Sequence, residues 1–114
     1  MHKMRLTDGP FQKIAAGKKS IECRLFDAKR QLIRIGDRIE FSPNDFPEKK
    51  LITRVAALHR ASTFAELFFK FPPEVFGGDS AESLLREIES FYSPDEEARW
   101  GVVGIEVERE EKSA

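Results

Sequence analysis

Strand-like segments flank a helical middle in this chain, and this order constrains the fold more than any other feature. Apolar and polar residues alternate over 38–41, β-branched residues cluster in the centre of 50–59, and alternation returns over 101–107. Helical signals occupy most of the sequence between the last two segments. The order predicts an α+β fold in which strands from the first half form a small barrel closed by the C-terminal strand. Periodicity alone does not specify the strand order.

Polar caps and glycine predict where the helices begin and end. A short strand over 4–6 precedes a helix with Asp8 as its cap and Pro10 in its first turn, and Gly17 ends that helix. Two further helices are expected to begin after Ser62 or Thr63 and after Asp79 or Ser80, and a turn or short helix is expected after Ser93.

Length and composition indicate one domain over residues 1–109, with a frayed tail over 110–114. The 114 residues, of which 40% are apolar, suffice for a single core. No stretch approaches the roughly 18 consecutive apolar residues of a membrane span, and no signal-peptide pattern opens the chain. We therefore expect a cytoplasmic protein, whose oligomeric state the sequence does not indicate.

Cysteine and histidine offer little support for a metal site. Cys23 is the single cysteine, so it has no internal disulfide partner, and its strand context is typical of a small buried side chain. His2 and His59 stand far apart in sequence without clustered carboxylates. We expect no metal and no cofactor.

The charge of the chain is strongly asymmetric although its net value is only −1. Residues 1–60 carry 14 Lys or Arg against 7 Asp or Glu, and residues 61–114 carry 5 against 13. The basic half can attract phosphate groups locally, because salt screens each charge beyond about 10 Å at 0.1 M. Attraction between the two halves is the alternative explanation.

Charged residues crowd the run from Gly17 to Arg24. On a regular strand Glu22 and Arg24 share one face and Lys19 points to the other. Lys19 and Glu22 reach one pocket only if Lys19 lies at the glycine-preceded entry to the strand, before the pleat is regular. An ion pair with the purely structural role of stabilising the entry to the strand would also account for these charges.

The spacing Gly-x-Lys-x-x-Glu-x-Arg, filled by Gly17, Lys19, Glu22 and Arg24, resembles the signature of ASCH domains, small relatives of the PUA-like RNA-binding barrels. Other segments resemble that family in its usual order along nearly the whole chain. They are Pro10-Phe11 with Ile14, residues 35–41, residues 62–68, residues 91–93 and residues 101–105. The resemblance implies a PUA-like β-barrel with helices packed around it.

The resemblance also implies a cleft between barrel and helices, lined by Lys19, Glu22 and Arg24. There the chain would bind RNA or a nucleotide-like or nucleoside-like ligand. Arg24 would bind a phosphate or carboxylate through paired hydrogen bonds, and Lys19 would supply a point charge or act as a general base. Further phosphate contacts are expected from Arg5, Lys18, Lys29 and Arg30.

Two enzymatic alternatives follow from the same resemblance. Some ASCH proteins are metal-independent amidohydrolases that deacylate N4-acylcytidine with a lysine, a threonine and a glutamate. Lys19 matches the lysine, but Glu22 stands where the threonine would be. Near the position of the glutamate, the only acidic residue is Asp79. Others resemble ribonucleases that use the lysine and a serine, which Ser93 would match, although Ser93 is equally a helix cap. A protein-interaction module using the acidic helical face is a third alternative.

Aromatic residues gather in the acidic half, where they suit either a core or a base-stacking surface. The helical spacing of Phe64, Phe68 and Phe91 predicts core packing for these three rings. Tyr92 and Trp100 have polar edges and acidic neighbours, so they are the better candidates for stacking on a base.

Overall fold

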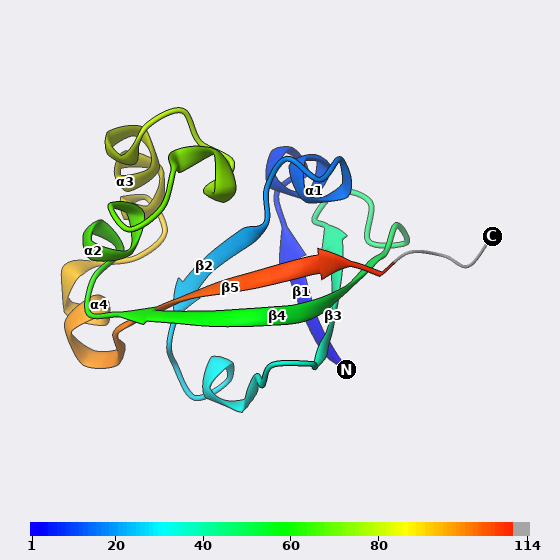
Figure 1. Ribbon diagram of the computed structural model, residues 1–114, viewed down its shortest axis with the longest axis horizontal. Coiled ribbons are helices and arrows are strands. Elements are labelled where there is room, and N and C mark those ends of the chain that lie inside the picture. Colours follow the sequence, from blue (N-terminus) through cyan, green and yellow to red (C-terminus); the bar gives the residue numbers. More distant parts are fainter. Residues whose placement is uncertain (111–114) are drawn as a thin grey trace.

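The computed structural model describes residues 1–110, which form a curled sheet with one helix on one side and a helical lobe at one end (Figure 1). The strands are β1 (His2–Leu6), β2 (Ile21–Leu25), β3 (Arg38–Pro43), β4 (Leu51–Ala61) and β5 (Val102–Arg109). The helices are α1 (Asp8–Ala15), α2 (Phe64–Phe68), α3 (Ala81–Glu89) and α4 (Pro94–Trp100), with short 3₁₀ helices η1 (Arg30–Leu32) and η2 (Pro73–Phe76).

The five strands form one sheet in the order β1-β3-β4-β5-β2. β1 and β3 are parallel, and the other neighbours are antiparallel. The expected α+β, PUA-like architecture is confirmed, but the C-terminal strand does not close a barrel. It lies inside the sheet between β4 and β2, and the sheet curls into a half-barrel that stays open between its edge strands β1 and β2.

β5 lies in the interior of the sheet, and its first half, residues 102–105, is buried on both faces. Val103, Ile105 and Val107 belong to a buried cluster inside the half-barrel, together with side chains of β1, β3 and α1. Val102 belongs to a second cluster on the opposite face, beneath α2, α3 and η2. The doubly buried half has no charged residue, whereas Glu106 and Glu108, on the face of Val102, are half-buried and exposed.

Gly104 lets the helical lobe approach the sheet closely. It lies opposite Cys23 in β2 and His59 in β4. A Cβ at this position would stand 2.9 Å from Ile21 Cγ2 and 3.3 Å from the side chain of Leu67 in α2. The missing side chain therefore allows α2 to pack closely on β5.

The predicted helix starts are largely confirmed. Thr63, Ser80 and Ser93 are the N-caps of α2, α3 and α4, and each side chain accepts a backbone N–H. The exception is α1, which begins one residue earlier than predicted. Its N-cap is Thr7, whose carbonyl accepts the N–H of Phe11, and Asp8 is the first helical residue.

The end of β5 lies further along the chain than predicted. The strand continues to Arg109, and the N–H of Glu110 donates to the carbonyl of Ile52 at 3.0 Å. The rest of the expected frayed tail, residues 111–114, lies outside the described residues. Within residues 1–110, no helix has the length and apolar character needed to cross a membrane.

Candidate functional site

Backbone hydrogen bonds hold Lys19 at the entry to β2. Gly17 adopts a φ of 78°, which turns the chain out of α1, and the N–H groups of Lys18 and Lys19 then both donate to the carbonyl of Lys13, at 2.8 Å and 3.1 Å. The N–H of Ser20 donates to the carbonyl of Val75 in η2 at 2.9 Å. Lys19 thus precedes the regular pleat, which begins at Ile21.

The side chains of Lys19, Glu22 and Arg24 form one ion network. Lys19 Nζ lies 2.8 Å from Glu22 Oε1, and Arg24 Nε donates to Glu22 Oε2 at 2.8 Å. The three side chains are only 10%, 8% and 15% exposed, respectively. The predicted convergence of Lys19 and Glu22 is confirmed, and so is the shared face of Glu22 and Arg24.

Arg24 also crosses the open side of the half-barrel. Its Nη2 donates to the main-chain carbonyl of Arg5 in β1 at 3.0 Å. The guanidinium thereby connects the two edge strands, which share no backbone ladder. The ion network occupies the opening that the curled sheet leaves.

Glu22 is held as an ionised carboxylate. Its burial by itself would raise the pKa, but the charges of Lys19 and Arg24 and their hydrogen bonds outweigh burial, so the pKa of Glu22 lies below its ordinary value. Each carboxylate oxygen already accepts a hydrogen bond from one of the two cations. Glu22 is therefore suited to orienting Lys19 and Arg24 rather than to donating a proton. Burial raises the pKa of the neighbouring Cys23 thiol, which is therefore a poor nucleophile.

The network opens onto a cleft with a volume of about 380 Å³ between the half-barrel and the helical lobe. Its barrel wall comes from β1, β2, α1 and the residues next to them, and its helical wall comes from α2, η2 and α3. The lining includes charged, hydroxyl and aromatic side chains that could contact a ligand: Arg5, Thr7, Lys13, Lys19, Glu22, Arg24, Phe76, Glu87, Phe91 and Tyr92.

Gly77 brings the two walls together at one end of the cleft. Lys13 Nζ in α1 donates to the carbonyl of Gly77 at 2.6 Å, across the space between α1 and η2. Gly77 has a φ of 82°, and a Cβ there would lie 3.1 Å from Cδ of Lys19 and 3.3 Å from Cδ of Lys13. A glycine at this position therefore lets both lysine stems pass beside η2.

The structure places some of the predicted site residues in the cleft and others outside it. The predicted residues that line the cleft are Lys19, Glu22, Arg24, Arg5 and Tyr92. The predicted contacts Lys18, Lys29, Arg30 and Ser93 do not line it.

Local structure explains why Lys29 and Arg30 lie outside the cleft. Lys29 and Arg30 belong to the η1 segment, where Arg30 Nη1 pairs with Asp27 Oδ2 at 3.0 Å. The exposed residue Asp79 also lies outside the lining, so it does not supply the third acidic group of the amidohydrolase arrangement.

Sequence reasoning missed Thr7, Lys13 and Glu87 as cleft residues. Thr7 follows β1 directly, Lys13 lies near the end of α1, and Glu87 lies on α3 one turn before Phe91. Their helical or strand-end positions resemble those of ordinary solvent-exposed polar residues. Only the tertiary approach of α1 and α3 places them around Lys19.

Phe91 differs from its predicted role in the core. Phe64 and Phe68 are buried as expected, but Phe91 is 61% exposed while it lines the cleft. The reason is that α3 ends at Glu89, so Phe91 follows the helix and leaves its apolar stripe. Tyr92 is half-buried, and its ring stacks on Phe64 with centroids 5.5 Å apart.

Replacing Ser93 with alanine is expected to lower the free energy of unfolding by about 1 kcal/mol and to leave ligand binding in the cleft unchanged. The Ser93 hydroxyl accepts the N–H of Glu96 at 3.2 Å, and the Glu96 carboxylate accepts the N–H of Ser93 at 3.0 Å. Urea denaturation measures the destabilisation, with Ser62→Ala as the exposed control without a capping role. Weaker binding or turnover at unchanged stability would instead give Ser93 a catalytic role.

Comparisons with known proteins agree with this fold. The family model described as ASCH domain matches residues 4–111. The crystal structure of hypothetical protein PH0355 is 35% identical, with a TM-score of 0.83 over 94% of this chain and 96% of that one. The solution structure of protein PF0455 from Pyrococcus furiosus is 34% identical, with a TM-score of 0.76 over 97% of this chain and 98% of that one.

A more distant structure shares the fold alone. A mutant of ZmASCH from Zymomonas mobilis is 15% identical, with a TM-score of 0.67 over 93% of this chain and 66% of that one. No curated protein matches the sequence significantly. The family match over almost the entire chain, together with two structures of similar length and sequence, shows that the chain belongs to the ASCH domain family.

Proposed function

We propose that the cleft binds RNA or a nucleotide-like ligand through Lys19 and Arg24. The observation that carries this proposal is the division of one cleft into a cationic wall and an aromatic wall. Its volume of about 380 Å³ falls within the range of small-molecule sites. The ASCH family to which the chain belongs is itself proposed to bind RNA.

The cationic wall suits a phosphate group. The cleft is lined by four cationic side chains and two carboxylates, so positive charge is in excess. The cations are Arg5, Lys13, Lys19 and Arg24, and the carboxylates are Glu22 and Glu87. A concave site with low-dielectric walls concentrates such a potential on an anionic ligand. Because Glu22 already orients Lys19 and Arg24, the two cations are held in position before a ligand arrives.

The aromatic wall suits a nucleobase. Phe76 is buried behind it, and Tyr92 brings its ring to the cleft from the segment after α3. Stacking of a base on an aromatic side chain contributes roughly 1 to 3 kcal/mol and tolerates any base. A ligand with both a phosphate and a base would contact both walls.

Deacylation of N4-acylcytidine is less well supported by the same residues. The carboxylate of Glu22 stands beside Lys19 where that arrangement needs a hydroxyl, and Asp79 lies outside the cleft. Glu22 is kept ionised by its two cations, which disfavours a role as general acid. These features favour ligand binding over acyl transfer.

The proposal predicts a salt-dependent affinity for single-stranded RNA that depends on Lys19. In wild-type protein, log Kd should change linearly with log salt concentration. Lys19→Ala should weaken binding and reduce the slope by about 0.7, because one phosphate is no longer neutralised. Fluorescence anisotropy with a labelled oligonucleotide measures both quantities. Lys29→Ala is the matched control, because Lys29 is an exposed lysine outside the cleft.

The competing functions give different results in the same samples. Equal weakening in Lys19→Ala and Lys29→Ala would contradict binding in the cleft. Release of cytidine from N4-acetylcytidine by wild-type protein, abolished in Lys19→Ala, would establish the amidohydrolase instead. Association with a protein partner that survives the combined Lys19→Ala and Arg24→Ala changes would favour the acidic helical face.

A further inference from the structure

Phe91 is an exposed aromatic ring at the mouth of the cleft. It is 61% exposed, yet it lines the same cleft as Lys19 and Arg24. Within the part of the chain that the structure describes, its ring stacks on no other ring, whereas the next residue, Tyr92, packs on Phe64. Phe91 therefore offers a free aromatic face beside the site.

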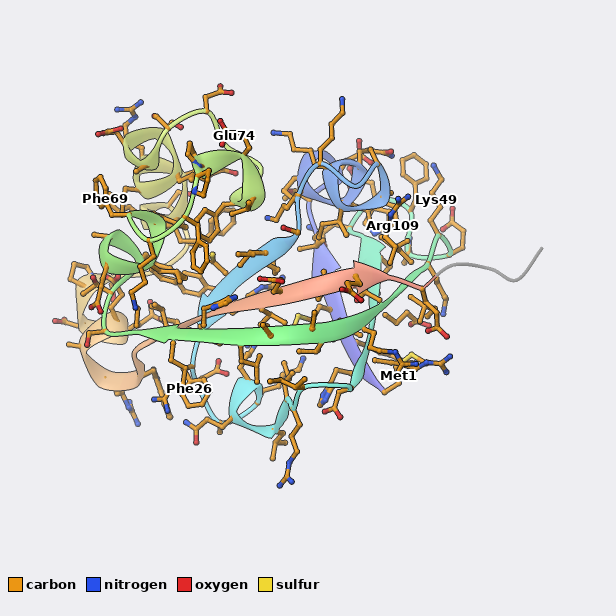
Figure 2. The ribbon with its side chains drawn as sticks, in the orientation of Figure 1. Met1, Phe26, Lys49, Phe69, Glu74 and Arg109 are labelled. Carbon is orange, nitrogen blue, oxygen red and sulfur yellow. The ribbon has the colours of Figure 1, made fainter. Side chains whose placement is uncertain are left out.

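A second exposed phenylalanine shows what is particular to Phe91. Phe69, directly after α2, is 67% exposed but does not line the cleft. Figure 2 shows Phe69 on the outer side of the helical lobe, away from α1. The two residues match in type and exposure and differ in their position relative to the cleft.

Charge across the cleft determines how a nucleic-acid strand can lie in it. Arg5 and Lys13 belong to the barrel wall, whereas Glu87 lies on α3 one turn before Phe91. The Glu87 carboxylate repels phosphates, and the cations opposite attract them. A strand is therefore expected to run its phosphates along the barrel wall and to turn its bases toward α3 and Phe91.

We propose that Phe91 stacks on the base adjacent to the one held inside the cleft, so that the ligand is a single-stranded RNA of at least two nucleotides. This inference rests on the proposed function and specifies its ligand class. The cleft volume of about 380 Å³ lies near the lower end of small-molecule sites, so a second base extends beyond it to its mouth. Phe91 is the aromatic side chain placed to receive that base.

The test compares a mononucleotide with a short oligonucleotide on two matched variants. Isothermal titration calorimetry measures Kd for cytidine monophosphate and for a mixed-sequence RNA tetranucleotide, in wild type, Phe91→Ala and Phe69→Ala. Phe91→Ala should weaken tetranucleotide binding about 5- to 150-fold, as expected when one base no longer stacks, and leave mononucleotide binding unchanged. Phe69→Ala should change neither Kd.

Two more variants separate stacking from simple apolar contact. Phe91→Trp should retain tetranucleotide affinity because it keeps an aromatic face, whereas Phe91→Leu should lose affinity as Phe91→Ala does. Full affinity in Phe91→Leu would overturn the stacking role.

The remaining outcomes distinguish failure of this inference from failure of the proposed function. Unchanged tetranucleotide binding in Phe91→Ala, with Lys19-dependent mononucleotide binding intact, would overturn the inference alone. Failure of wild-type protein to bind either ligand would overturn both. A wild-type dimer in sedimentation velocity that dissociates in Phe91→Ala, without any effect on RNA, would show that a second copy covers Phe91 and would also overturn the inference.

Discussion

Replacing Glu22 with alanine is expected to lower the free energy of unfolding by about 3 to 5 kcal/mol, far more than replacing an exposed cap such as Ser93. Glu22 is 8% exposed and pairs with two side chains that are themselves largely buried. Without the carboxylate, Lys19 and Arg24 are left as two close, poorly solvated positive charges. Since domains of this size are stable by about 5 to 15 kcal/mol, the variant retains only a part of its stability.

The matched control is Glu40→Ala. Glu40 is also a strand carboxylate, and its side chain is 15% exposed, but its partner Lys50 is 53% exposed and its Nζ lies 3.7 Å away. Removal of this looser pair should lower the free energy of unfolding by no more than about 1 kcal/mol. Urea denaturation of both variants gives the comparison, and equal destabilisation would mean that the network around Glu22 is no more than a surface ion pair.

Acid should remove the contribution of Glu22 to stability. The ordinary pKa of the carboxyl is 4.5, and in the folded protein the pKa lies lower because of Lys19 and Arg24. Near and below pH 4.5 the unfolded chain therefore binds the proton more readily than the folded chain. The contribution is complete above pH 4.5 and is lost as the pH falls through the folded-state pKa.

The comparison with Glu22→Gln isolates this carboxyl from the others. Asp37, beside His2, also has a lowered pKa, chiefly through its hydrogen bond to His2, but it titrates in both proteins. The difference in unfolding free energy between wild type and Glu22→Gln should be largest above pH 4.5 and should shrink at lower pH. A difference that stays constant over this range would contradict an ionised, cation-paired Glu22.

The convergence of charges at the centre of the candidate site could be predicted from the sequence because these charges lie within one segment. Strand alternation places Glu22 and Arg24 on one face, and Gly17 allows Lys19 to enter before the pleat is regular, so the three charges meet within one segment. The same reasoning could not find Lys13 or Glu87, whose presence in the cleft depends on how α1 and α3 approach β2. Such approaches are set by packing between distant segments and leave no local signal.

Two errors in the prediction have identifiable physical causes. Phe91 continued an apolar helical spacing, but α3 ends before it and leaves the ring exposed. The C-terminal strand was expected to close a barrel, but β5 pairs with both β4 and β2 and lies inside an open sheet. Periodicity shows that a residue lies on a strand or a helix, but it shows neither where the helix ends nor which strands are neighbours.

The most direct test of ligand binding in the cleft is a titration of ¹⁵N-labelled protein with single-stranded RNA, followed in two-dimensional ¹H–¹⁵N spectra. Binding through Lys19 and Arg24 predicts that the largest shift changes occur at the amides of β2, of Gly77 and of the end of α3, and that Lys19→Ala suppresses them. The largest changes at η1, around Lys29, would place the ligand outside the cleft and contradict the proposed function.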